Sequence, residues 1–501
     1  MSKKINAQPS AHTTAPFKES IFGFPRTQLP SARFLLLVIT LFLPSTVEAQ
    51  PAHAQISIDS VAAARLSIKF RSPVATDRWS FRNAYGGVIG LGERIESFSG
   101  VGFQGQNVNG DKLTAGEYRT NEKVSVVQYT LRIEPPSRAA DKSHVSWLDA
   151  SAGLLMLTDL LPQFDKQSSA VIVNLLLPDG WISSSNLNAS KESLQTSDPE
   201  NAVIVVGPEI REKRKQLENG EIVLTRVGSW PFSEDEVISF AEKVIQHYSR
   251  MTGVSFPRDV VLTLLPFQGG AGRWTAETRG NNVLVLLSNQ ESKRQLLARL
   301  NIILTHELFH LWVPNSLKLD GDYDWFFEGF TLYQALVTSV KLGLIDFQEY
   351  LSTLSRVYDS YLDVVNRDEL SLLELSQRRW TSGSSLVYDK GMLVAFIYDL
   401  TLRRRTAGKS SLADAYRLLF QRIESKSSEA NSAITSVLNS EVGMNDFSSH
   451  HIEEPEPIDL KSFLTPFGIE VLREDFRTRL AVLPKIDNDQ RRVLRDLGYR
   501  N

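Results

Sequence analysis

Two histidines, His306 and His310, stand four residues apart in the stretch LTHELFHLW, residues 304–312, and Glu307 follows the first of them. On an α-helix this spacing places both imidazoles on one face, about 6 Å apart along the axis. Two imidazoles so arranged can bind one tetrahedral zinc ion. Glu307 is poorly placed to bind the metal, but it can reach a water there as a general base.

The competing interpretation is that both histidines are ordinary core or surface residues, because a five-residue pattern can arise by chance. The neighbouring residues favour the metal site, since the helix is strongly apolar and is expected to be buried. Buried polar side chains need partners. Three of them on consecutive turns are unfavourable without a metal or a dense hydrogen-bond network.

A catalytic zinc ion needs a third protein ligand and leaves its fourth position to water. Glu328 is the best candidate, because it lies early in the next apolar segment, DWFFEGFTLY, where an unpaired carboxylate would be unfavourable. The alternative is an acid near a helix start that interacts with the helix dipole. We expect one Zn²⁺ per chain, bound by His306, His310 and Glu328.

These motifs carry a family resemblance. HELFHLW followed by the glutamate of WFFEGF resembles the gluzincin metallopeptidases, whose two helices supply His, His and Glu. VYDKG, residues 387–391, is similar to the Tyr-x-Lys-Gly segment of the aminopeptidase N family. That resemblance implies that Tyr388 stabilises the oxyanion of the transition state.

Among these relatives, the chain most resembles the glycyl-aminopeptidase-like family, through QYTLRIEPP, LLLPDGW, VIVVGPE and EPEPIDLKSFLTPFGIEV. The resemblance implies a β-rich amino-terminal domain before a thermolysin-like catalytic domain. Members often carry a trailing PDZ domain, which we do not expect after residue 480.

The sequence also departs from the aminopeptidase N pattern. The spacing from His310 to Glu328 is one residue shorter, and the amine-binding motif Gly-Ala-Met-Glu-Asn has no match. QGGAG, residues 268–272, is predicted to take its place. There Gly269 and Gly270 either let a peptide backbone pair with the edge strand or form a plain turn. Glu277 is a candidate for the amine-binding acid, but nothing in the sequence requires that role. Aminopeptidase action is therefore inferred from the family resemblance alone.

The elements that would position these residues predict an α+β multidomain fold. Short alternating apolar runs predict a β-sandwich-like domain over residues 50–212. Residues 213–480 are predicted to form the catalytic domain, with strands in IVLTRVG, DVVLTLLP and NVLVLLS and helices from about residue 289. REKRKQLENGE is predicted to be a charged connector, either a solvated face or a linker. FQGGAGRWTAETRGN is predicted to be a glycine-rich loop and residues 481–501 an exposed tail.

Residues 1–49 predict a secretory signal, because basic residues precede the apolar run FLLLVITLFL and small residues follow it. The alternative is a buried strand or a short core helix. The run is too short to span a bilayer, which needs about 20 residues. The chain has no cysteine, which excludes disulfides and zinc–thiolate sites. We expect export, to the periplasm or beyond.

Two functions are compatible with these features. The first is an exported zinc metallopeptidase or aminopeptidase that acts on peptides or proteins. A net charge of −3 gives no sign of nucleic-acid binding, and we expect no transmembrane domain beyond an uncleaved signal. The second is a non-catalytic exported binding module that keeps the fold. The intact Glu307 argues against this module, whereas the missing amine-binding motif leaves it open.

Overall fold

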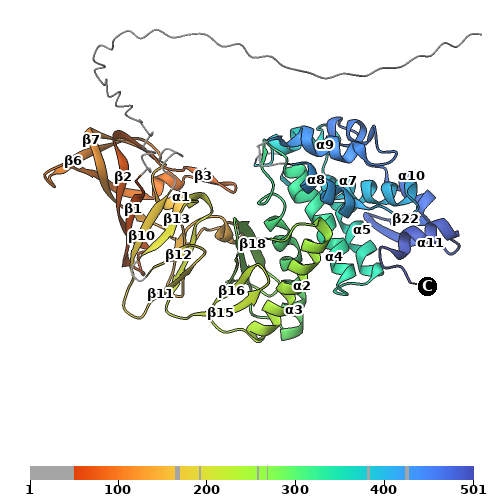
Figure 1. Ribbon diagram of the computed structural model, residues 1–501, viewed down its shortest axis with the longest axis horizontal. Helices are drawn as coiled ribbons and strands as arrows, with labels where there is room; N and C mark the ends of the chain where they lie inside the picture. The colour runs from red at the N-terminus through yellow and green to blue at the C-terminus, as the bar shows by residue number, and fades with distance from the viewer. Residues whose placement is uncertain are drawn as a thin grey trace, which may run out of the picture. The chain divides into compact units, whose positions relative to one another are not determined.

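Figure 1 shows the computed structural model, which describes residues 50–163, 170–190, 193–256, 259–267, 269–380, 384–423 and 428–500. These residues belong to one compact unit, Ala49–Asn501. The predicted signal, residues 1–49, and Gln268 of the glycine-rich stretch lie outside the described residues. Within the described ranges no helix is long and apolar enough to cross a membrane.

Two β-sheets form the amino-terminal part. The larger has the strand order β12-β13-β10-β1-β2-β7-β5-β6, and the smaller has the order β11-β14-β9-β8. Phe70 and Tyr129 of the larger sheet share one core with Leu155 and Ile204 of the smaller. Two sheets packed face to face are what the alternating apolar runs predict. The strands are β1 (Ala52–Ser60), β2 (Arg65–Ser80), β5 (Ile95–Val101), β6 (Asn107–Thr114), β7 (Glu117–Arg132), β8 (Trp147–Leu148), β9 (Gly153–Met156), β10 (Val171–Leu176), β11 (Ile182–Ser185), β12 (Asn188–Ala189), β13 (Leu194–Thr196) and β14 (Val203–Gly207).

A short hairpin and a single helical turn also lie in this part of the chain. The hairpin pairs β3 (Ala84–Tyr85) with β4 (Val88–Ile89), and the turn is α1 (Leu157–Leu160).

A five-stranded mixed sheet follows, in the order β15-β16-β17-β19-β18. Its three central strands are parallel and its two edge strands are antiparallel to their neighbours. One face shares a core with the smaller sheet, and the other packs against α2 (Glu234–Thr252) and α3 (Lys293–Glu307). The strands are β15 (Ile210–Leu217), β16 (Gly220–Val227), β17 (Val260–Pro266), β18 (Trp274–Arg279) and β19 (Asn282–Leu287).

Both edge strands differ from the prediction. REKRKQLENGE, predicted as a connector, forms most of β15, and FQGGAGRWTAETRGN, predicted as a loop, contains β18. The charged residues of β15 are tolerated because one side of an edge strand faces solvent, where Lys213 pairs with Asp235 and Lys215 with Glu242. The linker interpretation was therefore wrong, whereas the charged side chains of β15 do form a solvated face.

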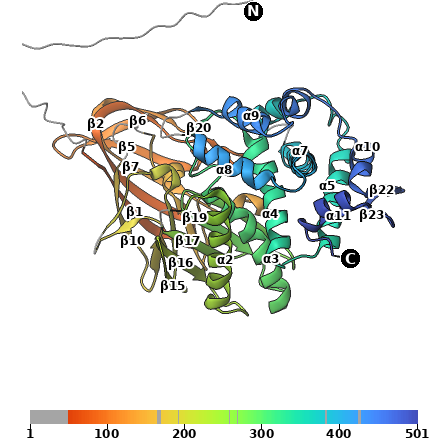
Figure 2. The same cartoon turned by 45° about the vertical axis from the view of Figure 1, so that its right-hand side comes forward.

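Helices dominate after β19, as predicted. Helix α7 lies within this helical part and contacts α4, α5, α6 and α8 (Figure 2). The helices are α4 (Thr331–Lys341), α5 (Phe347–Asp363), α6 (Leu372–Gln377), α7 (Ser384–Arg405), α8 (Leu412–Arg422), α9 (Ala430–Ser440), α10 (Leu460–Leu464) and α11 (Asn488–Arg495). Short strands pair as β20 (Leu319–Asp320) with β21 (Ser428–Glu429), and as β22 (Ile469–Glu474) with β23 (Arg477–Val482).

The segment 481–501, predicted to be an exposed tail, is partly buried. Val493, Leu494 and Leu497 are almost free of solvent contact. The Tyr499 ring lies 5.4 Å from the ring of Phe347, centroid to centroid. The buried residues of α11 and the turn after it form one apolar face. The surrounding charges conceal that face in the sequence.

Candidate metal centre

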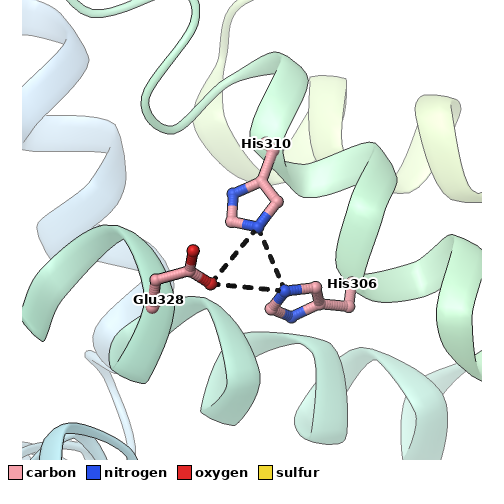
Figure 3. A group of neighbouring side chains, drawn as sticks. All are labelled: His306, His310 and Glu328. Atoms are coloured by element: carbon pink, nitrogen blue, oxygen red, sulfur yellow. Dashed lines mark hydrogen bonds and ion pairs between the residues drawn. The ribbon is translucent and has the colours of Figure 1, made fainter. Parts of the chain in front are cut away.

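His306, His310 and Glu328 face one another in the helical part of the chain (Figure 3). The two histidine Nε2 atoms are 3.0 Å apart, and Glu328 Oε2 lies 3.6 Å from His310 Nε2 and 3.7 Å from His306 Nε2. Ligand atoms about 2.0–2.1 Å from a tetrahedral zinc ion lie about 3.3 Å from one another. The three measured distances bracket this value, so the residues fit a zinc ion.

The two histidines come from one continuous segment whose helical geometry changes between them. His306 is in the last turn of α3, whereas His310 is in a tighter 3₁₀ turn, Leu308–Leu311. His310 Nδ1 lies 2.9 Å from the backbone oxygen of Val313, to which it donates when protonated. This hydrogen bond leaves the Nε2 lone pair directed at the other two ligand atoms. His306 Nδ1 is buried and has no hydrogen-bond partner among the described residues.

Glu328 lies in a π-helical turn, Trp325–Phe330, that leads directly into α4. The residue is 8% exposed. Burial opposes its ionisation, but His306, His310 and Arg379 together lower the pKa of Glu328 to about 2. The carboxylate is therefore anionic, and it faces two imidazoles and a guanidinium. These partners favour a metal ligand over a simple interaction with the helix dipole.

Glu307 is adjacent in sequence but lies outside the triangle of ligand atoms. The residue is 6% exposed, and burial raises the pKa of Glu307 to about 7 despite the opposing effects of His306 and Thr278. Thr278 Oγ1 lies 2.8 Å from Glu307 Oε2 and 2.9 Å from the Glu307 backbone oxygen. A carboxylate whose pKa is close to neutral pH suits a general base. Thr278 was missed by the sequence analysis because it lies in the stretch predicted as a loop.

Tyr388, on α7, is connected to this group through Arg379. Arg379 Nη2 donates to the Tyr388 hydroxyl oxygen at 2.6 Å and to Glu328 Oε1 at 2.8 Å. Burial and the Glu328 carboxylate raise the pKa of the Tyr388 phenol well above its ordinary value, so the phenol keeps its proton. No motif pointed to Arg379, which follows α6 in the polar stretch SQRRW.

The two predicted glycines lie in the turn before β18. The backbone nitrogen of Arg273 donates to the Gly270 oxygen at 3.3 Å, which matches the plain turn of the two interpretations. A Cβ atom added at Gly269 would contact Phe267 and Arg273, and one added at Gly270 would meet no described atom within 4 Å.

Glu277, the candidate amine-binding acid, is on β18 and already has three partners. The Tyr85 hydroxyl donates to it at 2.6 Å and Arg279 Nε donates at 3.0 Å, while His144 Nδ1 lies 2.7 Å from its other oxygen. Burial would raise the pKa of Glu277, but Arg279 and His144 hold it below its ordinary value. This carboxylate is therefore ionised, and it links the five-stranded sheet to His144 and Tyr85 of the amino-terminal part.

Comparison with known proteins agrees with this geometry. Residues 299–394 match the model of the M61 glycyl aminopeptidase family, and this stretch contains His306, Glu307, His310, Glu328 and Tyr388. The predicted resemblance to that family is confirmed over these residues. A comparison with curated proteins gave no match.

Solved structures share the fold. An aminopeptidase N family protein from Idiomarina loihiensis has a TM-score of 0.73 at 16% identity, covering 84% of this chain and 79% of that chain. An M1 zinc metallopeptidase from Deinococcus radiodurans has a TM-score of 0.51 at 12% identity, covering 82% and 95%. A mutant of the latter, bound to a Tyr-Ser-Ala substrate, also has a TM-score of 0.51, at 13% identity with the same coverage. The predicted mixed α+β multidomain fold is thereby confirmed.

Proposed function

We propose that this chain, whose residues 299–394 match the M61 glycyl aminopeptidase family, is a zinc-dependent peptidase that removes residues from the amino terminus of peptides. The observation that carries the proposal is the convergence of His306 Nε2, His310 Nε2 and Glu328 Oε2 beside the buried Glu307. Residues 213–480 would then form a thermolysin-like catalytic domain. We also propose, from the sequence alone, that residues 1–49 direct export.

Each residue of the site has a separate role in the proposed hydrolysis. A zinc ion held by His306, His310 and Glu328 supplies Lewis-acid activation of water and of the substrate carbonyl. Glu307 takes the proton of the attacking water and delivers it to the leaving amine. Tyr388 donates its hydroxyl proton in a hydrogen bond to the oxyanion that forms on the substrate carbonyl.

Recognition of a free amine is the part that depends most on the family resemblance. Glu277 is our candidate for the carboxylate that binds the substrate amine. Its negative charge helps to raise the pKa of Glu307. Its oxygens are occupied by Tyr85, His144 and Arg279, so an incoming ammonium group would have to replace or join these donors. We therefore propose an aminopeptidase in which Glu277 binds the amine with help from the amino-terminal part of the chain.

The decisive experiment measures metal content and product pattern together. The purified protein is assayed for zinc and is then given a defined peptide, in free and amino-terminally acetylated forms, with and without chelator. We expect one zinc ion per chain, chelator-sensitive removal of one residue at a time, and no cleavage of the acetylated peptide.

Three results would change the conclusion. Bound zinc without any chelator-sensitive hydrolysis would overturn the peptidase and support the non-catalytic binding module. Internal cuts, or cleavage of the acetylated peptide, would keep the peptidase but overturn the aminopeptidase. Chelator-sensitive activity in Glu307→Gln at the wild-type rate would overturn the mechanism.

A further inference from the structure

Arg379 lies between the third metal ligand and the residue that stabilises the oxyanion. The same nitrogen, Nη2, donates to Glu328 Oε1 at 2.8 Å and to the Tyr388 hydroxyl oxygen at 2.6 Å. The side chain of Arg379 is 12% exposed. A buried guanidinium that links two groups of one site is a candidate positioning residue, because charge-assisted hydrogen bonds fix geometry as well as charge.

Glu328 uses its two oxygens for different partners. Oε2 faces the Nε2 atoms of His306 and His310, whereas Oε1 is bonded to Arg379. A carboxylate can bind a cation through one oxygen or through both. Because Arg379 occupies Oε1, the structure favours binding through Oε2 alone.

The Tyr388 hydroxyl is held by the same guanidinium. An arginine N–H can only donate, so the phenol oxygen is the acceptor in the bond with Arg379. The bond with Arg379 therefore does not use the phenol proton. Without substrate the hydroxyl is hydrogen-bonded to the Glu328 carboxylate, and an oxyanion would replace that acceptor. The positive charge beside the oxygen also strengthens the O–H as a hydrogen-bond donor.

Other side chains fix Arg379 in turn. Its Nη1 atom donates to Asp324, which immediately precedes the π-helical turn that carries Glu328. The guanidinium carbon lies 4.5 Å from the ring centroid of Trp380 and 5.5 Å from that of Phe327. Stacking of this kind limits the orientations of an arginine side chain.

We propose that Arg379 is a positioning residue that restricts Glu328 to one-oxygen metal binding and orients the Tyr388 hydroxyl. The proposal rests on the proposed function. It adds that metal binding and oxyanion stabilisation both depend on the guanidinium of Arg379. It also distinguishes Arg379 from a residue that merely neutralises buried carboxylates.

The sign of the effect on zinc affinity tests the first part. A cation near the site repels the metal, so loss of a merely neighbouring charge would strengthen zinc binding. Loss of a positioning residue weakens it, and we expect Arg379→Gln to reduce zinc affinity about 10–100-fold in a chelator competition. In the cobalt(II)-substituted protein we expect weaker visible absorption, because a freed Oε1 raises the coordination number.

A double-mutant comparison at saturating zinc tests the second part. If Arg379 acts on the chemical step in part through the phenol, Arg379→Gln lowers kcat, and it lowers kcat by a smaller factor in the Tyr388→Phe background than in the wild type. Independent losses of kcat that multiply in the double variant would overturn this part.

Arg403→Gln is the matched control. Arg403 is on α7 with Tyr388 and forms a buried pair with Asp399 at 2.9 Å, away from the three ligands. We expect it to lower the unfolding temperature without changing zinc affinity or the cobalt spectrum. If Arg379→Gln behaves in the same way, or binds zinc more tightly, the proposal is wrong.

Arg379→Lys provides the test if Arg379→Gln does not fold. Lysine keeps the charge but lacks the planar fork that serves Asp324, Glu328 and Tyr388 together. We expect a folded protein with the altered cobalt spectrum and reduced kcat, whereas wild-type values of both would overturn the proposal. Zinc affinity and the cobalt spectrum are measured without substrate. A wild-type protein that binds zinc but hydrolyses no peptide would therefore overturn the proposed function without deciding the role of Arg379 in metal binding.

Discussion

Gly329 and Gly391 bring the backbone of the segment that carries Glu328 against the helix that carries Tyr388. A Cβ atom added at Gly329 would lie 2.5 Å from the Cα of Gly391, and one added at Gly391 would lie 2.7 Å from the backbone oxygen of Trp325. Neither gap admits a side chain. The separation between the segments that carry Glu328 and Tyr388 is therefore set by two glycines.

Gly391→Ala should push these two segments apart. Overpacking of a buried contact destabilises by about 1–3 kcal/mol, and the displacement of Tyr388 should lower kcat as well. Chemical denaturation and steady-state kinetics measure the two effects. Gly270→Ala is the control, because a Cβ atom there meets no described atom within 4 Å, and its unfolding free energy should stay within about 0.5 kcal/mol of wild type. Equal stability of the two variants would contradict the prediction.

Glu307→Gln should separate metal binding from proton transfer. The Glu307 carboxylate is outside the triangle formed by His306, His310 and Glu328, so zinc content should be unchanged. Removal of a general base should lower kcat by about 10²–10⁴-fold. Metal analysis and steady-state assays on the same preparation check both statements. A variant that loses its zinc would show instead that Glu307 helps to hold the metal.

Thr278 should matter through its hydroxyl group. Thr278→Val keeps the shape of the side chain but removes the oxygen that lies 2.8 Å from Glu307 Oε2. A hydrogen bond to a charged group contributes about 1.5–3 kcal/mol, so we expect kcat/KM to fall about 10–100-fold. Thr278→Ser retains the hydroxyl and should retain most of the activity. If the serine variant is as slow as the valine variant, packing of the methyl group is the cause.

His247 should make stability depend on pH. Burial, with the nearby charges of Lys341 and Arg250, lowers the pKa of His247 to about 4, compared with about 6.5 in an unfolded chain. Between these values the unfolded state binds more protons, so the stabilisation is complete above about pH 6.5 and is lost as the pH falls toward 4. Because the residue is only partly buried, we expect roughly 1–2 kcal/mol.

Denaturation of wild type and His247→Gln across this pH range measures the effect. The unfolding free energy of His247→Gln should decline less on acidification. His450→Gln, at an exposed histidine, should follow the wild type. Parallel curves for all three proteins would contradict the assignment.

The parts of the site that local spacing determines could be predicted from the sequence. His306, Glu307 and His310 lie on one helical segment, and Glu328 is noticeable because a carboxylate among aromatic residues needs a partner. Tyr388 was predicted only through its resemblance to a family motif. Arg379 and Thr278 could not be predicted, because each reaches its partner only through the tertiary fold.

The errors in the fold have a similar origin. The charged residues of β15 lie on an edge strand, where solvent tolerates them, and the glycines before β18 concealed a strand that supplies Thr278 and Glu277. The buried face of α11 is only a few residues long and is surrounded by arginine and aspartate. In each case hydropathy reported the exposed side of an element, whereas the element formed because it pairs or packs along its other side, β15 with β16 and β18 with β19.

The chain contains no cysteine, so the metal would act as its crosslink between distant positions. A zinc ion bound by His306 and Glu328 closes a loop of about twenty residues, which on the chain-entropy model of a disulfide corresponds to about 3 kcal/mol of stabilisation. Chelators should therefore lower the unfolding temperature, while reducing agents should not affect it. The same three side chains would then contribute both to catalysis and to the stability of the helical part against unfolding.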